Sequence, residues 1–506
     1  MSSVNNKLIL KNTLVLYLRM ILVMAANLYV VRAVLHLLGV VDYGIYNVVG
    51  GVVSMFSFLN STLTTSSQRY FSIELARGDA RSLNRWFCLN ITTFLIFIVI
   101  FVIIAESIGL WFVNTQMVIP EERMFAANVV YQLSILTFCI HFFNIPYNAL
   151  IIAREKMKAF AYISIIEVFL KLLIVLFLSF SRWDKLIVYG ILMFLVSGCI
   201  TSSYIIYNLK NFEESKYRPY WNRKEMKELL SFSGWHFFGT FSTVIRSQGI
   251  NILLNMFFNP AINAARAIAF QVYHAISQLS HNFIVAVKPQ IYKSYATEEL
   301  ESLYRLIIRS SMVCSFLVSI LIYPILMDTG FVLGLWLKEI PDYAVVFTQL
   351  VLVNGLIDAI NGPLSAAALS TGKIRNYELL VATTILLNLP LSYIALKLGA
   401  EPTATMIVSI VISILTTYAR AYMVYKMVGL PLSRCTIMFL KLIFASSLTC
   451  VIMYFSVYND SDMSLLKFIL YTIFVVIMLS ATYLIFVFDR NDVKYAYNFI
   501  KKKIRK

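Results

Sequence analysis

The sequence predicts an all-α polytopic membrane protein with about fourteen transmembrane helices. Of its 506 residues, 59% are apolar and only 14% are charged. The apolar residues gather in runs long enough to cross a bilayer, which takes about 20 residues in a helix. A water-soluble chain of this composition would need an implausibly large core.

Each predicted span is an apolar run of roughly 18 to 30 residues, bounded by charged or turn-forming residues. The runs lie at about 12–38, 44–75, 86–113, 124–152, 159–181, 185–209, 229–258, 262–290, 303–326, 343–370, 377–397, 403–426, 436–457 and 465–488.

The connections between these runs alternate in charge, which predicts the orientation of the chain. Basic residues occupy every second connection, as at 77–85, 154–158 and 210–227, and acids such as Asp42, Glu121 and Glu122 occupy the others. By the positive-inside rule, we expect both termini to be cytoplasmic. The net charge of +17 then reflects topology, and we expect no nucleic acid partner.

We expect neither a cofactor nor a metal site, and we do not expect an enzyme. The six cysteines lie singly within apolar runs, without metal-ligand spacing. The longest cytoplasmic connection, near 210–228, has the length of a short surface linker and leaves no room for an extramembrane catalytic domain.

Two short matches predict an internal repeat. Gln68–Ser72 resembles Gln290–Ser294 about 222 residues later, and Asn144–Pro146 resembles Asn361–Pro363 at an offset of about 217. Two homologous halves of six helices follow, related by an axis along the membrane normal, as in transporters that rock two lobes. The predicted divisions are an N-terminal lobe (1–209), a cytoplasmic linker (210–228), a C-terminal lobe (229–427), and two additional helices with a basic tail (428–506).

The candidate substrate-binding residues come from the first, second, seventh and eighth spans, which carry the strongest polar stripes. In the eighth, a stretch from Asn263 to Lys288 places ionisable residues on one broad helical face, which is costly in lipid and points to a polar cavity. The candidates are Arg19, Asn27, Arg32, Gln68, Arg69, Arg246, Asn251, Arg266, His274, Gln278 and His281.

Some of these residues have a second interpretation. Arg19 and Arg69 are long enough to reach the cytoplasmic headgroups from within a span. His274 and His281 also fit buried, hydrogen-bonded histidines. Arg246, about sixteen residues into its span, reaches neither surface easily.

The positive sign of this set favours an anionic substrate. Arginine offers forked donors that match phosphate oxygens, and the neighbouring hydroxyls and amides suit sugar hydroxyls. The membrane acids are expected elsewhere: Glu106, Glu167 paired with Lys171, and Asp358, a candidate for coupling to an ion or proton.

Four segments resemble the bacterial oligosaccharide repeat-unit flippases of O-antigen and capsule export. They are Leu38–Gly39, Asp42–Tyr46, Gln68–Tyr70 and Glu74–Asp79. These flippases belong to the multidrug, oligosaccharidyl-lipid and polysaccharide exporter superfamily, which also contains the MATE transporters.

The resemblance implies two six-helix lobes around a central cavity, two extra C-terminal helices and alternating access. The implied substrate is an undecaprenyl-diphosphate-linked oligosaccharide, moved from the cytoplasmic to the periplasmic leaflet. Glycosyltransferases or a polymerase of the same pathway are the implied partners. The diphosphate-binding arginines of related lipid II flippases correspond by position to Arg19 or Arg32, to Arg69, and to Arg266 or Arg246.

Three alternatives remain open at the level of sequence. A multidrug or toxin cation antiporter of the same superfamily would favour acids in its cavity. A membrane-embedded glycan-modifying enzyme would need paired carboxylates. A scaffold without transport would bind no lipid diphosphate.

Overall fold

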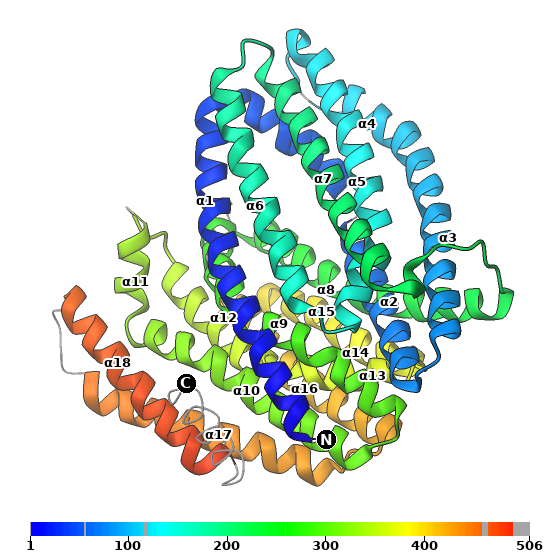
Figure 1. Ribbon diagram of the computed structural model, residues 1–506. Coiled ribbons are helices and arrows are strands. Elements are labelled where there is room, and N and C mark those ends of the chain that lie inside the picture. The colour runs from blue at the N-terminus through cyan, green and yellow to red at the C-terminus, as the bar shows by residue number, and fades with distance from the viewer. Residues whose placement is uncertain are drawn as a thin grey trace. The chain divides into compact units, whose positions relative to one another are not determined.

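The computed structural model describes residues 2–54, 57–115, 117, 119–258, 260–337, 339–457 and 464–488. Throughout these ranges the chain forms helices joined by short turns, and no strand occurs in them (Figure 1). The all-α prediction is therefore confirmed. The predicted basic tail lies outside the described residues.

The helices of the first half follow the predicted runs closely. They are α1 (Ser2–Ser54), α2 (Ser57–Arg77), α3 (Ala80–Ile104), the π-helical turn η1 (Ala105–Gly109), α4 (Leu110–Thr115), the 3₁₀ turn η2 (Glu121–Arg123), α5 (Met124–Ala153), α6 (Met157–Phe180), α7 (Lys185–Asn211) and the 3₁₀ turn η3 (Glu213–Ser215).

The second half has more, shorter helices. They are α8 (Arg223–Phe257), α9 (Pro260–Ala296), α10 (Leu300–Met327), α11 (Thr329–Trp336), α12 (Ala344–Asp358), α13 (Asn361–Ser370), α14 (Arg375–Leu386), α15 (Asn388–Lys397), α16 (Ala404–Val428), α17 (Leu432–Val457), α18 (Leu465–Thr482) and the π-helical turn η4 (Tyr483–Val487).

Within the described ranges, eleven helical segments are long and apolar enough to cross a membrane. They match eleven of the fourteen predicted runs. The other three runs, at 44–75, 229–258 and 262–290, are also helical in the residues that the structure describes, but none of them has a described stretch that is long and apolar enough to be counted. They are three of the four runs for which the strongest polar stripes were predicted, so the expected count of fourteen is consistent with the structure.

The chain divides into two compact units, Met1–Phe237 and Phe238–Lys506. The division falls inside α8. The first part of α8 packs on the N-terminal unit, where Met226 and Leu229 join its apolar core. The predicted four-part division, whose linker ends at residue 228 within the first turns of α8, stays a prediction.

Helix α1 is interrupted at Gly39, which adopts a left-handed φ of 79° with ψ of 168°. Glycine tolerates this conformation because it has no Cβ. The part before Gly39 is one of the apolar spans, and the part after it continues toward α2. The sequence therefore encodes a change of direction where the first predicted span ends.

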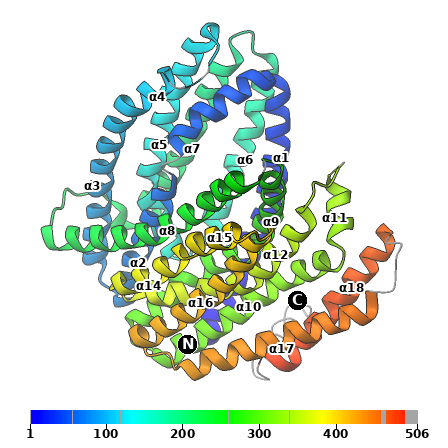
Figure 2. The same ribbon diagram turned by 180° about the vertical axis from the view of Figure 1, so that it is seen from behind.

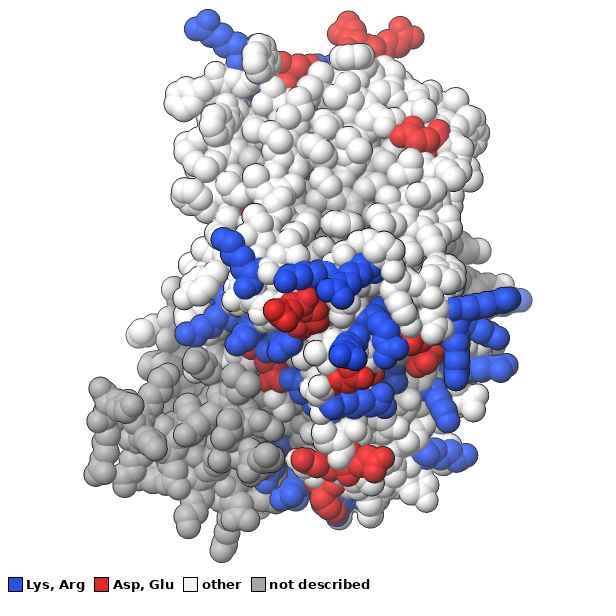
Figure 3. All heavy atoms as spheres, turned by 45° about the vertical axis from the view of Figure 1, so that its right-hand side comes forward, with Lys and Arg blue, Asp and Glu red and all other residues white. Residues whose placement is uncertain are grey.

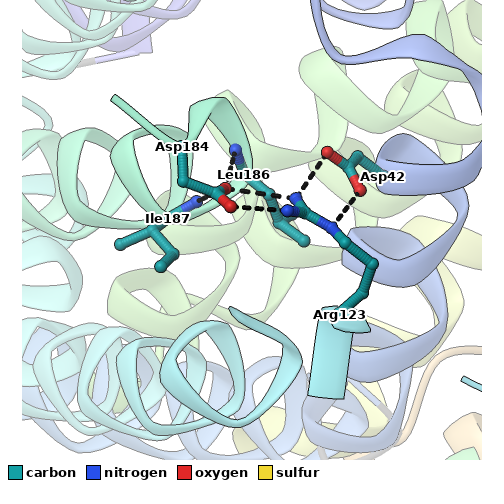
Figure 4. Close-up of polar contacts among 5 residues, drawn as sticks. All are labelled: Asp42, Arg123, Asp184, Leu186 and Ile187. Atoms are coloured by element: carbon teal, nitrogen blue, oxygen red, sulfur yellow. Dashed lines mark hydrogen bonds and ion pairs between the residues drawn. The ribbon is translucent and has the colours of Figure 1, made fainter. Parts of the chain in front are cut away.

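A cluster around Arg123, which we call the Arg123 clasp, joins three elements at the acid-rich end of the N-terminal unit (Figure 4). Arg123 donates to both oxygens of Asp42 on α1, at 2.8 and 2.6 Å, and to both oxygens of Asp184, at 2.5 and 3.1 Å. Asp184 also caps α7 by accepting from the backbone N–H groups of Leu186 and Ile187. One guanidinium thus ties the starts of α5 and α7 to α1.

The opposite end of the N-terminal unit holds the basic connections. There Asn84 donates to the backbone oxygens of Glu214 and Lys216, and Arg154 pairs with Glu214. Figure 3 shows Lys and Arg gathered in a broad band, beside a large surface that carries almost no charge.

In the C-terminal unit, two predicted spans are broken by proline. Pro363 and Pro390 have no N–H to donate to the carbonyl four residues earlier, and the helix restarts at each place, giving α12–α13 and α14–α15. The polar groups at the breaks find partners: Ser311 donates to the Ile360 carbonyl at 3.2 Å, and Asn388 donates to Ser409 at 3.0 Å. Membrane helices tolerate such breaks where neighbouring helices satisfy the freed groups.

Helices α9 and α16 organise the packing of this unit. Helix α9 packs against α10, α12 and α13, and α16 packs against α12, α13, α14 and α15 (Figure 2). The break between α12 and α13 therefore lies between two long helices, and Asp358 is the last residue of α12.

Candidate functional site

A small cavity lies inside the C-terminal unit, among α8, α9, α12 and α16. Its volume is about 40 Å³. The polar side chains in its lining are Arg246, Ser247, Arg266, Tyr273, Asn354, Asp358 and Ser409. A water molecule needs about 10–15 Å³ by this measure, so the cavity has room for a few waters.

Arg266 is held firmly in this cavity, with only 4% of its surface exposed. Its Nη1 donates to the side chain of Asn251, and its guanidinium lies 4.5 Å from the ring centre of Phe270. Asn263 fixes the same region by donating to the backbone oxygen of Asn251 at 3.0 Å. The buried Nε of Arg266 has no hydrogen-bond partner among the described residues, which leaves a donor for a ligand or water.

Arg246 enters the cavity from α8 and is half-buried. Its charge and that of Arg266 repel each other. Two guanidinium groups inside one small membrane-embedded space are unfavourable unless an anion or a carboxylate accompanies them.

Asp358 supplies the one carboxylate in the lining. It accepts hydrogen bonds from Asn354 at 2.8 Å and from Asn361 at 3.5 Å. It makes no ion pair among the described residues, but Arg246 and Arg420 both attract it electrostatically. The carboxylate is thus held by amides rather than locked against a guanidinium.

The expectation that the membrane acids lie apart from the arginines is wrong for Asp358. Arg246, Arg266 and Asp358 come from three helices, but the packing of α9 against α12 and the hydrogen bonds from α9 to Asn251 of α8 bring them to one cavity. Their juxtaposition depends on tertiary packing, so no sequence spacing reveals it.

Close packing of α9 on α12 depends on Gly355. A Cβ at this position would lie 2.5 Å from Cε2 of Tyr273, a cavity residue. The neighbouring Asn354 and Asp358 flank it on α12. Sequence analysis did not single out Gly355 or Tyr273.

Ser409 was also missed, although the sequence holds a signal for it. Thr405, Ser409, Ser413 and Thr417 recur every four residues along α16, and all four are buried. A hydroxyl row at this spacing marks one helix face. In this structure that face points into the unit, where Ser409 meets Asn388 and the cavity.

The remaining candidates of α9 do not join this cavity. His274, Gln278 and His281 are exposed, and none of them belongs to its lining. The polar stretch from Asn263 to Lys288 therefore combines a buried Arg266 with the exposed side chains of His274, Gln278 and His281.

The candidates of the N-terminal unit lie at four separate places. Arg69 is buried beside Gln68, with its guanidinium 4.7 and 5.1 Å from the ring centres of Tyr70 and Phe232. Arg19 is half-buried and lies 4.4 Å from the ring centre of Phe160. Asn27 is exposed on α1.

Arg32 lies elsewhere, in a second cavity of this unit. The cavity measures about 300 Å³ and also contains His36. The two residues lie one turn apart on α1.

Glu167 and Lys171 form the predicted pair on α6, with their charged atoms 2.6 Å apart. Glu106 accepts from Gln132 on α5 at 3.0 Å, at the π-helical turn that follows α3. Neither acid lines the C-terminal cavity.

No family model and no curated protein matches the sequence. Solved structures match by fold. The structure described as MATE in the bent conformation has a TM-score of 0.71 at 13% identity and covers 84% of this chain and 97% of its own.

Two further solved structures match this chain by fold. An outward-facing multidrug resistance MATE family transporter of the MOP superfamily has a TM-score of 0.70 at 13% identity, covering 84% of this chain and 96% of its own. The third is a MOP superfamily transporter from Pyrococcus furiosus, for which the reverse polarity of the binding pocket is described as suggesting a different function. It has a TM-score of 0.64 at 14% identity and covers 82% of this chain and 96% of its own. The chain thus has the fold of the MATE transporters of the MOP superfamily.

Proposed function

We propose that this protein is a flippase that moves an undecaprenyl-diphosphate-linked oligosaccharide across the membrane by alternating access. One observation carries the proposal: Arg246 and Arg266 line the C-terminal cavity together with a single carboxylate, Asp358. The lining therefore holds a net positive charge inside the membrane. Guanidinium groups bind phosphate through paired hydrogen bonds, so this charge favours a diphosphate over an organic cation.

The cavity itself is too small to enclose the sugar. At about 40 Å³ it holds a few waters or small ions. We therefore propose that this cavity provides the positive charge that attracts the diphosphate and does not enclose the whole headgroup. In this role the arginines attract the diphosphate when the transport cycle opens the site.

Asp358 is the proposed coupling residue. When its carboxylate is ionised, it offsets part of the charge of Arg246 and Arg266; when it takes up a proton, the cavity gains a full positive charge and attracts an anion more strongly. A proton fits this role better than a metal cation, because a cation would face two guanidinium groups at close range.

The polyprenyl tail stays in the bilayer in this mechanism. Exposing it to water would cost on the order of 0.8 kcal/mol per CH₂ group, so only the polar head crosses through the protein. In this proposal the basic end of the N-terminal unit faces the cytoplasm, both termini lie on that side, and the protein resides in the bacterial inner membrane. The substrate comes from glycosyltransferases that assemble the oligosaccharide on its lipid.

The test is export of the surface glycan by cells in which the chromosomal copy is replaced by variants. Arg246→Gln with Arg266→Gln should abolish export and weaken binding of undecaprenyl diphosphate to the purified protein at least tenfold, since charge-assisted hydrogen bonds contribute about 1.5–3 kcal/mol each. Arg305→Gln, an exposed arginine of the same unit, is the matched control and should leave both unchanged. Normal export by a well-expressed double variant would exclude the proposal.

Asp358→Asn extends the same experiment to coupling. The amide mimics the protonated acid, so binding should persist while transport loses its dependence on a proton gradient in reconstituted vesicles. Asp358→Glu keeps an ionisable group and should retain that dependence. If Asp358→Asn responds to the gradient as the unmodified chain does, the coupling residue lies elsewhere.

The second candidate function is export of organic cations, and the presence of Asp358 in the cavity is the observation that favours it. This function predicts that Asp358→Asn stops efflux of a cationic dye while the arginine variants do not. The flippase proposal predicts no dye efflux from any of these proteins.

A further inference from the structure

The second cavity is an open groove between α1 and α6 of the N-terminal unit, two helices that lie side by side (Figures 1 and 2). Its volume of about 300 Å³ is at the lower end of the range for small-molecule sites. The lining consists of Tyr29, Arg32, Ala33, His36 and Leu37 from α1, and Val175 and Ser179 from α6.

The chemistry of this lining selects an anion. Arg32 and His36 are exposed, and no carboxylate belongs to the lining. Neither side chain forms an ion pair among the described residues. Tyr29 adds a phenolic hydroxyl, so the groove offers a permanent cation, a second cation when His36 is protonated, and a neutral donor.

The groove also has an apolar side. Ala33, Leu37 and Val175 contribute carbon atoms next to the polar groups. A free inorganic anion gains nothing from such a surface, whereas the first carbons of a lipid do.

Its depth matches that of lipid headgroups. The groove occupies the last turns of two apolar spans, Asn12–Gly39 and Met157–Phe180, since His36 precedes Gly39 by three residues and Ser179 precedes Phe180 by one. Just beyond lie Phe180 and Trp183, with 85% and 82% of their surfaces exposed. Exposed aromatic residues at the end of a span are typical of the membrane–water interface.

We propose that this groove binds the phosphate of an anionic bilayer lipid, with Arg32 as the main contact, His36 and Tyr29 as additional donors, and the first acyl or glycerol carbons against Ala33, Leu37 and Val175. Its lining shares no residue with that of the cavity in the C-terminal unit, and the inference does not depend on the flippase proposal. A lipid bound here holds α1 against α6 just before the Gly39 break.

The test measures how much phosphatidylglycerol stays bound when the protein is purified from vesicles of phosphatidylcholine and phosphatidylglycerol and weighed intact by native mass spectrometry. Arg32→Gln with His36→Gln should reduce the bound phosphatidylglycerol about tenfold. Arg182→Gln is the matched control: it removes an exposed arginine at the same end, outside the groove, and should change nothing. Because the substituted side chains are exposed, we expect unchanged thermal unfolding.

Three outcomes would overturn the proposal. The first is that the double variant retains as much phosphatidylglycerol as the unmodified protein. The second is that Arg182→Gln loses as much phosphatidylglycerol as the double variant, which would indicate general attraction to positive charge. Displacement of the lipid by millimolar inorganic phosphate would identify a free anion as the ligand instead. Failure of this test leaves the roles of Arg246 and Arg266 untouched, because those are measured by glycan export.

Discussion

At the scale of single residues, the candidate site shows how much the position of a charged side chain depends on its neighbours. Sequence analysis singled out Arg246, Arg266 and Asp358 because ionisable groups are costly in membrane helices. It treated the acid as separate from the arginines, because nothing in the spacing of the three residues joins them. Their common cavity follows from the close approach of α9 to α12.

Gly355 is the residue that permits this approach, and its substitution tests it. Gly355→Ala should lower the free energy of unfolding by about 1–3 kcal/mol, because the new Cβ would lie 2.5 Å from the ring of Tyr273 and the ring must move. Thermal unfolding of the detergent-solubilised protein measures the change. Gly198→Ala is the control: no atom lies within 4 Å of its Cβ position, so alanine should be neutral or slightly stabilising. Equal stability of the two variants would contradict the packing argument.

At the scale of elements, α1 is made of two parts whose neighbours differ. The part before the Gly39 break packs along α6 and forms the groove that contains Arg32. The part after it is fixed to α5 and α7 through Asp42 and the Arg123 clasp. Sequence analysis predicted the span that ends near residue 38 and the acids of this end, but not that one arginine would connect them.

The clasp makes the stability of the N-terminal unit depend on pH. Burial alone raises the pKa of Asp184, but Arg123 and the backbone N–H groups of Ile187 and Leu186 outweigh it and hold the pKa below its usual 3.8. A carboxylate of this kind stabilises the fold above the unfolded pKa of about 4, and the stabilisation disappears as pH falls through the folded value.

Arg123→Gln should therefore destabilise the protein at pH 7 by about 1–2 kcal/mol, the lower part of the range for charged hydrogen bonds, because these side chains are partly exposed. The difference from the unmodified protein should shrink as the pH falls below about 4. Thermal unfolding across pH 3–7 measures this, with Arg182→Gln as the control at the same end of the unit. A difference that stays constant down to pH 3 would show that Asp184 does not contribute through its charge.

At the scale of the whole molecule, the charge pattern predicts which ends of the spans face the cytoplasm. Exposed Glu121 lies at the acid-rich end of the N-terminal unit and exposed Lys224 in its basic connection. A membrane-impermeant maleimide should label Glu121→Cys in intact spheroplasts and Lys224→Cys only after permeabilisation. The unmodified chain, which has its own exposed Cys199 and Cys450, gives the background. The reverse labelling pattern would invert the orientation.

The sequence by itself determined the helical class, the positions of the spans and the charges of their connections. These properties follow from local composition: a run of about 20 apolar residues has few stable structures other than a membrane helix. The sequence also predicted spans at 44–75, 229–258 and 262–290, which are not counted as membrane spans by length and apolar composition alone.

Only the tertiary structure decided which polar residues meet. It buried Arg266 beside Asn251, left His274 and His281 exposed, brought Asp358 into one cavity with two arginines, and joined Asp42 to Asp184 through Arg123. The physical reason is that a helix presents polar groups around its whole circumference, and the neighbouring helices determine which of them are enclosed. In this protein the helix break near Pro363, just after Asp358, and the absence of a side chain at Gly355, which lets Tyr273 approach, determine which helices lie next to one another.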